Sequence, residues 1–140
     1  MRWICLLALA ALSSPAGDIS SIKSEPNAKK RAKRAFDFAN SSLVEARSAY
    51  SASDYRKALA EVRQVDEAIS LGFASLQSTG KAPRKSRAYK RAELRLRELI
   101  RHMDDFAREA ALDDRASIEA VAHHAQQVHD EILTGIMEKK

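Results

Sequence analysis

Apolar side chains recur at steps of three and four residues over four long stretches of this 140-residue chain. That spacing places them on one side of an α-helix, whereas a half-buried strand would alternate apolar and polar residues. The stretches cover about residues 26–50, 55–77, 84–111 and 113 to near the C-terminus. Four amphipathic helices joined by short breaks predict an all-α fold, an antiparallel four-helix bundle built from two helical hairpins.

The breaks between these stretches carry residues that stop and start helices. The segment 51–54 supplies a turn that ends in Asp54, a suitable N-cap for the second helix. The segment 78–83 is the clearest break, because a glycine follows one helix end and a proline opens the next helix. Asp113 and Asp114 are expected to cap the fourth helix.

The first sixteen residues have the three parts of a secretory signal peptide. Arg2 supplies a positive charge, residues 3–12 form an apolar run, and Ser14 and Ala16 form a small-residue cleavage site. We expect cleavage after Ala16, which removes residues 1–16. The remaining chain is then expected to be secreted or periplasmic.

The signal peptide contains the only Cys and the only Trp of the chain. Its removal excludes disulfides, thiol catalysis and thiolate metal sites, and it leaves no apolar run of the ~18 residues that a membrane-spanning helix needs. Residues 17–26 are polar and without helical periodicity, so we expect a flexible tether there. Residues 27–140 are expected to form a single helical-bundle domain.

The first two predicted helices carry small and aromatic residues around an Asp-Tyr turn. The members of this pattern are Ala46, Tyr50, Asp54, Tyr55, Ala58, Leu59, Val62 and Val65. Over about residues 43–70 the pattern resembles one tetratricopeptide-type hairpin. Ser53 stands where that family usually has glycine, and the usual closing proline is missing. The resemblance implies a protein-interaction module without catalytic chemistry.

Charge is distributed unevenly along the chain. Residues 81–101 hold nine Lys or Arg against two Glu, a net charge of +7, whereas residues 102–140 hold nine acids against four bases, a net charge of −5. A second basic cluster covers residues 29–34, where five of six residues are Lys or Arg. The arginines of the third helix lie away from its apolar stripe, so they are available to an anionic partner.

We therefore predict an anion-binding or partner-binding face on the third helix. Lipid head groups, polysaccharide and an acidic protein fit this face, whereas nucleic acid is disfavoured because no exposed aromatic residue among the arginines could stack on a base. The alternative interpretation is a solvated basic face, partly neutralised by the acidic fourth helix. The candidate residues are Arg84, Lys85, Arg87, Arg91, Arg95 and Arg101.

Histidines in the last two helices suggest an alternative function, a metal-binding bundle. Glu98 and His102 form one Glu-x-x-x-His pair, and Glu119 and His123 form another. Imidazole and carboxylate groups from facing helices can bind a metal ion. Helical phase, however, points His123 toward solvent. This favours surface Glu/His pairs, with His129 at the edge of the core.

No catalytic motif is recognisable, since the chain lacks a nucleophile elbow, a phosphate-cradling glycine loop and a His-Glu-x-x-His sequence. We therefore expect no enzymatic activity and no cofactor. The leading interpretation is a non-catalytic binding or scaffolding module of the cell envelope. A homo-oligomer is the expectation if the apolar stripes are wider than four helices can cover.

Overall fold

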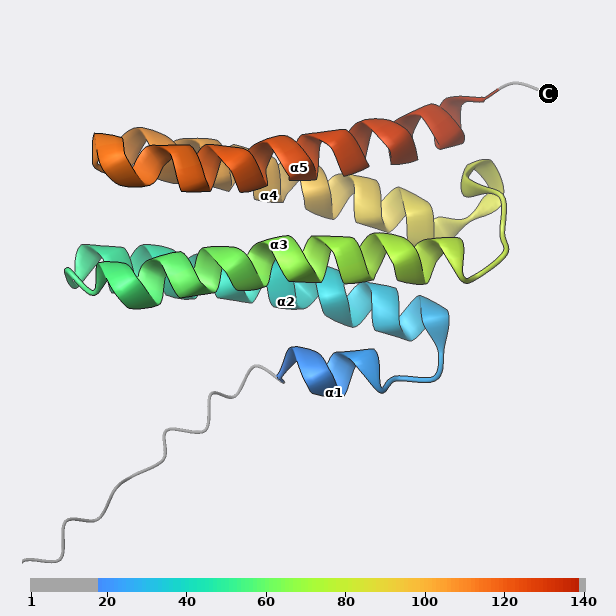
Figure 1. Ribbon diagram of the computed structural model, residues 1–140. Coiled ribbons are helices and arrows are strands. Elements are labelled where there is room, and N and C mark those ends of the chain that lie inside the picture. The colour runs from blue at the N-terminus through green and yellow to red at the C-terminus, as the bar shows by residue number, and fades with distance from the viewer. Residues whose placement is uncertain (1–17, 139–140) are drawn as a thin grey trace, which may run out of the picture.

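A computed structural model describes residues 18–138, and over this range the chain is helical with no strand (Figure 1). This confirms the all-α prediction. The signal peptide predicted for residues 1–16 lies outside the described residues. The elements are α1 (Ile19–Lys23), α2 (Ala28–Ser51), α3 (Tyr55–Gln77), the 3-10 turn η1 (Pro83–Lys85), α4 (Arg87–Glu109) and α5 (Leu112–Met137).

The four long helices form two hairpins, α2 with α3 and α4 with α5, which stack on each other (Figure 1). Helix α2 lies beside α4, and α3 lies beside α5. The polar contacts between α2 and α4 advance in the same direction along both helices, from Asp37–Arg95 (3.2 Å) to Arg47–Glu109 (2.9 Å). Between α3 and α5, Asp66 pairs with His124 at 2.6 Å.

The prediction of an antiparallel bundle is therefore correct within each hairpin and wrong between them, where neighbouring helices run parallel. The cause is the connection over residues 78–86, which crosses from the end of α3 to the start of α4, beside the start of α2 (Figure 1). Such stacking of helical hairpins is the arrangement that helical-repeat proteins use.

Side-chain caps define the starts of most helices. Asn27 accepts a hydrogen bond from the Lys30 N–H (2.9 Å) at the start of α2, and Asp54 accepts one from the Lys57 N–H (3.2 Å) at the start of α3, as predicted. Ser86 caps α4, so the helix predicted from residue 84 begins three residues later, after the 3-10 turn.

The segment predicted as a flexible tether contains the short helix α1. Ile19 and Ile22, three residues apart, share one face of α1 and are buried against the first hairpin. The Lys23 ammonium also pairs with Glu67 of α3 at 2.6 Å. A five-residue helix is too short to show periodicity, which is why the sequence pattern did not indicate it.

Tyr50 joins the two hairpins at the end of the molecule that holds both tight turns. Its hydroxyl accepts a hydrogen bond from the Ala111 N–H (2.7 Å) and donates one to Asp114 (3.0 Å). Its ring lies edge-on to Phe106, with centroids 5.4 Å apart. The prediction that Asp113 and Asp114 cap the fourth helix is wrong, because α5 starts after Ala111 without a side-chain cap and Asp114 is occupied by Tyr50.

Alanine dominates the buried face of α2, and larger apolar side chains fill the centre of the bundle. Because alanine is small, α2 and α3 approach closely and make the most extensive helix contact of the molecule. The alanines buried on α2 are Ala32, Ala35, Ala39, Ala46 and Ala49. Large, fully buried side chains include Ile69, Leu76, Leu96, Leu99, Met103, Phe106, Ile118 and Ile132.

Gly72 of α3 allows Phe36 of α2 to pack directly against the helix backbone. A Cβ atom at Gly72 would lie 2.7–2.9 Å from three atoms of the Phe36 ring. Contacts that short require the ring or the helix to shift. Gly72 is thus required by packing, although glycine weakens a helix interior.

We predict that Gly72→Ala lowers the free energy of unfolding by about 1–2 kcal/mol, because overpacking outweighs the gain in helix propensity. Urea unfolding followed by circular dichroism measures this change. Ser70→Ala, on the exposed side of the same helix, should be neutral or slightly stabilising. Replacing the Phe36 ring by a smaller side chain, Phe36→Leu, should reduce the loss of stability that Gly72→Ala causes. Equal stability of Gly72→Ala and the wild type would contradict this packing account.

Candidate functional site

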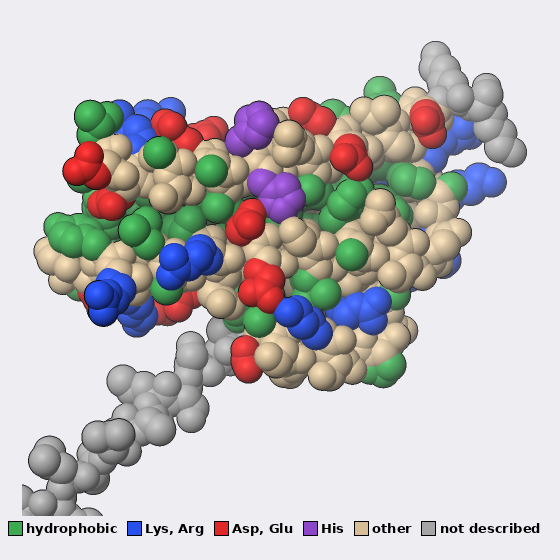
Figure 2. Space-filling view, viewed as in Figure 1, with side chains coloured by type: hydrophobic (Ala, Val, Ile, Leu, Met, Phe, Trp, Pro, Cys, Tyr) green, Lys and Arg blue, Asp and Glu red, His purple; other side chains and the backbone are tan. Residues whose placement is uncertain are grey.

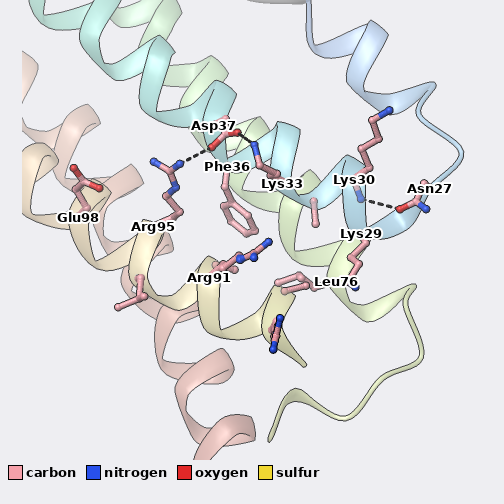
Figure 3. Close-up of a pocket in the computed structure, with 15 residues that line it drawn as sticks. Asn27, Lys29, Lys30, Lys33, Phe36, Asp37, Leu76, Arg91, Arg95 and Glu98 are labelled. Carbon is pink, nitrogen blue, oxygen red and sulfur yellow. Dashed lines mark hydrogen bonds and ion pairs between the residues drawn. The ribbon is translucent and has the colours of Figure 1, made fainter. Parts of the chain in front are cut away.

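A groove of about 810 Å³ lies between the first halves of α2 and α4, away from the tight turns (Figure 3). Its floor is apolar. The groove exists because alanines line both helices here, while the long side chains beside them are cations that extend toward water. The apolar lining residues are Ala32, Phe36, Leu76, Ala88, Ala92 and Leu94.

Six cationic side chains also line this groove, which we call the basic groove. Lys29, Lys30 and Lys33 come from α2, and Arg87, Arg91 and Arg95 come from α4. Because α2 and α4 run parallel, the basic starts of both helices lie side by side. The face over α3 and α5, by contrast, mixes acidic and basic side chains (Figure 2).

Acidic side chains neutralise only part of the basic groove. Asp37 pairs with Lys33 at 2.7 Å and with Arg95 at 3.2 Å (Figure 3). Lys30 lies 3.8 Å from Glu25.

Three other cations of the groove have no acidic side chain as an ion-pair partner. Over residues 18–138, no ion pair involves Lys29, Arg87 or Arg91. Guanidinium and ammonium groups bind carboxylates and phosphates. The apolar floor adds little contact area, because Ala32, Phe36, Leu76 and Ala92 are at most 3% exposed. The site therefore suits an anionic partner that contacts the cations at the rims.

The structure divides the six predicted anion-binding residues into two sets. Arg87, Arg91 and Arg95 line the basic groove. Arg84 and Lys85 are exposed in the 3-10 turn, and Arg101 is exposed further along α4; these three are outside the groove lining.

The three lysines of α2 were not among the predicted site residues. Their cluster at 29–34 is visible in the sequence, but its local spacing does not reveal that α2 lies beside α4. Only the pairing of the two helices assigns the lysines to this site.

The four residues of the predicted metal site do not assemble into one. Glu98 and His102 pair on α4 with 3.8 Å between carboxylate oxygen and imidazole nitrogen, while Glu119 and His123 are exposed on α5. Over the part of the chain that the structure describes, no three His, Cys, Asp or Glu side chains are grouped to hold a metal ion.

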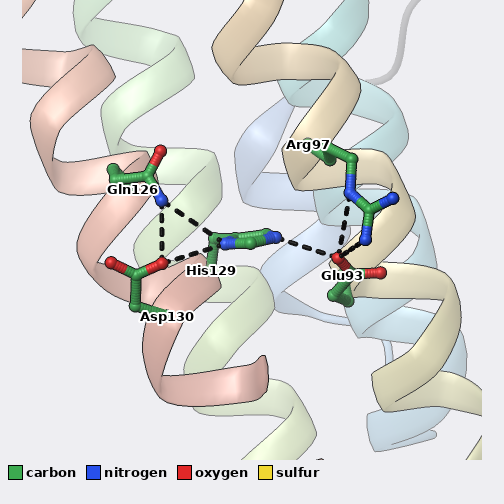
Figure 4. A network of polar contacts seen from close by, with 5 residues as sticks. All are labelled: Glu93, Arg97, Gln126, His129 and Asp130. Atoms are coloured by element: carbon green, nitrogen blue, oxygen red, sulfur yellow. Dashed lines mark hydrogen bonds and ion pairs between the residues drawn. The ribbon is translucent and has the colours of Figure 1, made fainter. Parts of the chain in front are cut away.

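A partly buried polar network joins α4 to α5 (Figure 4). The His129 imidazole lies between two carboxylates, 2.9 Å from Glu93 and 3.1 Å from Asp130. Glu93 also accepts hydrogen bonds from the Arg97 guanidinium, one of them from Nε at 3.1 Å. His129 lies at the edge of the core, at 9% exposure, and Glu93, which in the sequence counts only as one acid among the basic residues 81–101, is 6% exposed. Glu93 follows Tyr89 by four residues, a spacing that could have indicated a position beside the apolar stripe.

This network lowers the pKa of both carboxyl groups. Burial pushes the pKa of Glu93 upward, but hydrogen bonds from His129 and Arg97 outweigh burial and leave the pKa below its ordinary value. The hydrogen bond with His129 is the main cause that lowers the pKa of Asp130, and Gln126 adds a second hydrogen bond (2.8 Å).

Comparisons with protein-family models, with curated proteins and with solved structures found no match to this chain. Within residues 18–138, the helices lack the combination of length and apolar composition that crossing a membrane requires.

The lowered pKa values predict that acid weakens the fold. The unfolded chain takes up protons first, so the stabilisation is complete above the ordinary carboxyl range near pH 4 and is lost as pH falls through the lower folded pKa values. His129→Gln removes the imidazole and should flatten this loss. Urea unfolding at a series of pH values from about 6 to about 3 measures it.

The exposed His123→Gln, on the same helix, is the matched control and should keep the wild-type pH profile. Superimposable profiles for His129→Gln and the wild type would show that the network does not link stability to pH.

Proposed function

We propose that this chain is an exported, non-catalytic binding or scaffolding module of the cell envelope that holds an anionic partner in the basic groove. The proposal is carried by three cations of the groove, Lys29, Arg87 and Arg91. Among the described residues, none of the three forms an ion pair with an acidic side chain. Six cations and two acids, Asp37 and Glu98, line the groove, and this excess of positive charge favours an anionic partner.

The stacked hairpins support a binding role. In our proposal the mature chain is a four-helix bundle of two hairpins, released by cleavage of the signal peptide. The residues behind the tetratricopeptide resemblance include Ala46, Ala58, Val62 and Val65, which are buried where α2 meets α3. Ser53 adopts a φ of 62°, the left-handed conformation that favours the glycine usual at this position in the family.

Nucleic acid remains the less favoured anion. Stacking on bases needs exposed aromatic rings. The aromatic side chain that lines the basic groove is Phe36, which is only 3% exposed, and Tyr89 on α4 is also buried.

We predict that reversing two groove charges, Arg87→Glu with Arg91→Glu, reduces partner capture by roughly tenfold, since each lost exposed ion pair removes about 0.5–1 kcal/mol. The measurement is affinity capture from envelope extract at low and high salt. High salt should weaken the wild type more than the variant.

Lys90→Glu and Arg101→Glu are matched controls, because both side chains are exposed on α4 outside the groove lining. They should retain capture, and helix content should be unchanged in all variants. Capture that is equal for the groove variant and the wild type would refute the proposed site.

The export part of the proposal has its own test. Expressed in full in a bacterial host, the chain should reach the periplasmic fraction with Gly17 as its first residue, as N-terminal sequencing would show. Leu7→Arg interrupts the apolar run and should leave the precursor uncleaved. A wild-type product that keeps residues 1–16 would contradict export by this signal.

A further inference from the structure

We propose that the rims of the basic groove bind a flexible acidic polysaccharide, a sugar polymer that carries carboxylate or sulfate groups. This inference rests on the proposed function and names the partner class for the same site. The anionic groups of the polymer contact the cations of both rims, and its hydroxyl groups donate hydrogen bonds to Asp37 and Glu98. Such binding uses exposed polar side chains and requires no access to the buried apolar floor.

The cations stand at regular intervals along both rims. Lys29 and Lys33 on α2 are four residues apart, and so are Arg87, Arg91 and Arg95 on α4, an interval of about 6 Å along each helix at 1.5 Å per residue. All five residues are exposed. Two rows of repeated cations favour a chain with repeated anionic groups over a single small anion, because each further contact on the same chain is intramolecular.

The cationic surface continues beyond the groove onto the connection over residues 78–86, at the end of the bundle (Figure 1). Lys81, Arg84 and Lys85 are exposed in this segment, which leads into α4. Over residues 18–138, no ion pair involves these three side chains. A flexible polymer can follow the groove and then this segment, whereas a flat bilayer cannot follow the surface around the end of the molecule.

Two acids among the cations favour a sugar polymer over a purely anionic chain. Asp37 pairs with Arg95 at 3.2 Å, and the half-exposed Glu98 lies 3.8 Å from His102, a separation too long for a hydrogen bond (Figure 3). Carboxylates repel the carboxylates of an acidic polypeptide but accept hydrogen bonds from hydroxyl groups. An acidic sugar carries both anionic groups and hydroxyl donors, so it matches both kinds of side chain.

The composition of the groove also favours a polysaccharide over nucleic acid. The lysines of α2 belong to the basic cluster at residues 29–34, and such clusters are typical of patches that bind heparin, an acidic polysaccharide. Single-stranded nucleic acid requires exposed aromatic rings for stacking. Phe36, the aromatic residue of the groove lining, is 3% exposed.

Calorimetric titration of the purified protein tests the proposal. The probes are a short oligogalacturonate, whose charges are carboxylates, and a heparin oligosaccharide of similar length, which also carries sulfates. At least one should bind, and their relative affinities distinguish the two anionic groups. Methyl-esterified oligogalacturonate, which keeps the sugar chain without the charge, should bind about tenfold more weakly or not at all, and so should monomeric galacturonate.

Polyglutamate with the same number of carboxylates tests the role of the hydroxyl groups. It should bind several-fold more weakly than oligogalacturonate, because it lacks hydroxyl donors and is repelled by Asp37 and Glu98. Glu98→Ala should narrow this difference, because it relieves the repulsion and removes an acceptor for the sugar. Glu119→Ala, in the corresponding exposed Glu-x-x-x-His pair of α5, is the matched control and should preserve the difference. A difference that Glu98→Ala leaves unchanged would contradict the role of this carboxylate.

Two double variants report on the groove and on its extension. Arg87→Gln with Arg91→Gln should weaken binding of the preferred oligosaccharide about tenfold, since two charge-assisted contacts are lost. Arg84→Gln with Lys85→Gln should weaken binding of long polygalacturonate and leave the short oligomer unaffected. Lys90→Gln, outside the groove lining, is the control and should bind like the wild type. Thermal unfolding confirms that each variant is folded.

Several outcomes would overturn the inference. These are equal binding of the charged and esterified oligomers, unchanged affinity in the Arg87 and Arg91 variant, polyglutamate binding as tight as that of oligogalacturonate, and binding to phosphatidylglycerol vesicles without binding to either oligosaccharide. If the oligosaccharides fail while arginine-dependent capture from envelope extract persists, the polysaccharide is wrong and the proposed function stands. If both fail, the basic groove is not a binding site.

Discussion

The small size of alanine along α2 determines both how the fold packs and where it is open. Toward α3, alanines allow the most extensive helix contact among the described residues, and Gly72 lets the Phe36 ring pack against the backbone of α3. Toward the first half of α4, Ala32 lies beside a helix that also carries alanines, at 88 and 92, so the space between the rims of the two helices is left partly open. The alanines of α2 thus account both for the dense packing of the first hairpin and for the groove beside it.

The sequence predicts the helices well because their signals are local. The three- and four-residue spacing and the cap at Asp54 depend on residues close in the chain, and the structure confirms them. The parallel pairing of α2 with α4 depends on how residues 78–86 cross the bundle, which periodicity does not describe. For the same reason, Arg87, Arg91 and Arg95 are predictable as a basic face, while the lysines opposite them become part of the site only through tertiary packing.

Polar residues inside the bundle show a second limit of sequence patterns. In the sequence, Glu93 is one acidic residue among many basic neighbours. Its side chain is nevertheless buried, because hydrogen bonds with His129 and Arg97 satisfy its carboxylate. Asp114 is likewise a residue type that caps helices, but its carboxylate instead accepts a hydrogen bond from the Tyr50 hydroxyl. In each case a partner far away in the chain decides the role of the residue.

The two hairpins are joined in a different way at each end of the molecule. At the end that holds both tight turns, the side chain of Tyr50 connects them through contacts with Ala111, Asp114 and Phe106. At the other end, about 36 Å away along the 24 residues of α2, the covalent connection over residues 78–86 joins α3 to α4. The spacing of α2 and α4 along the groove is therefore constrained from both ends.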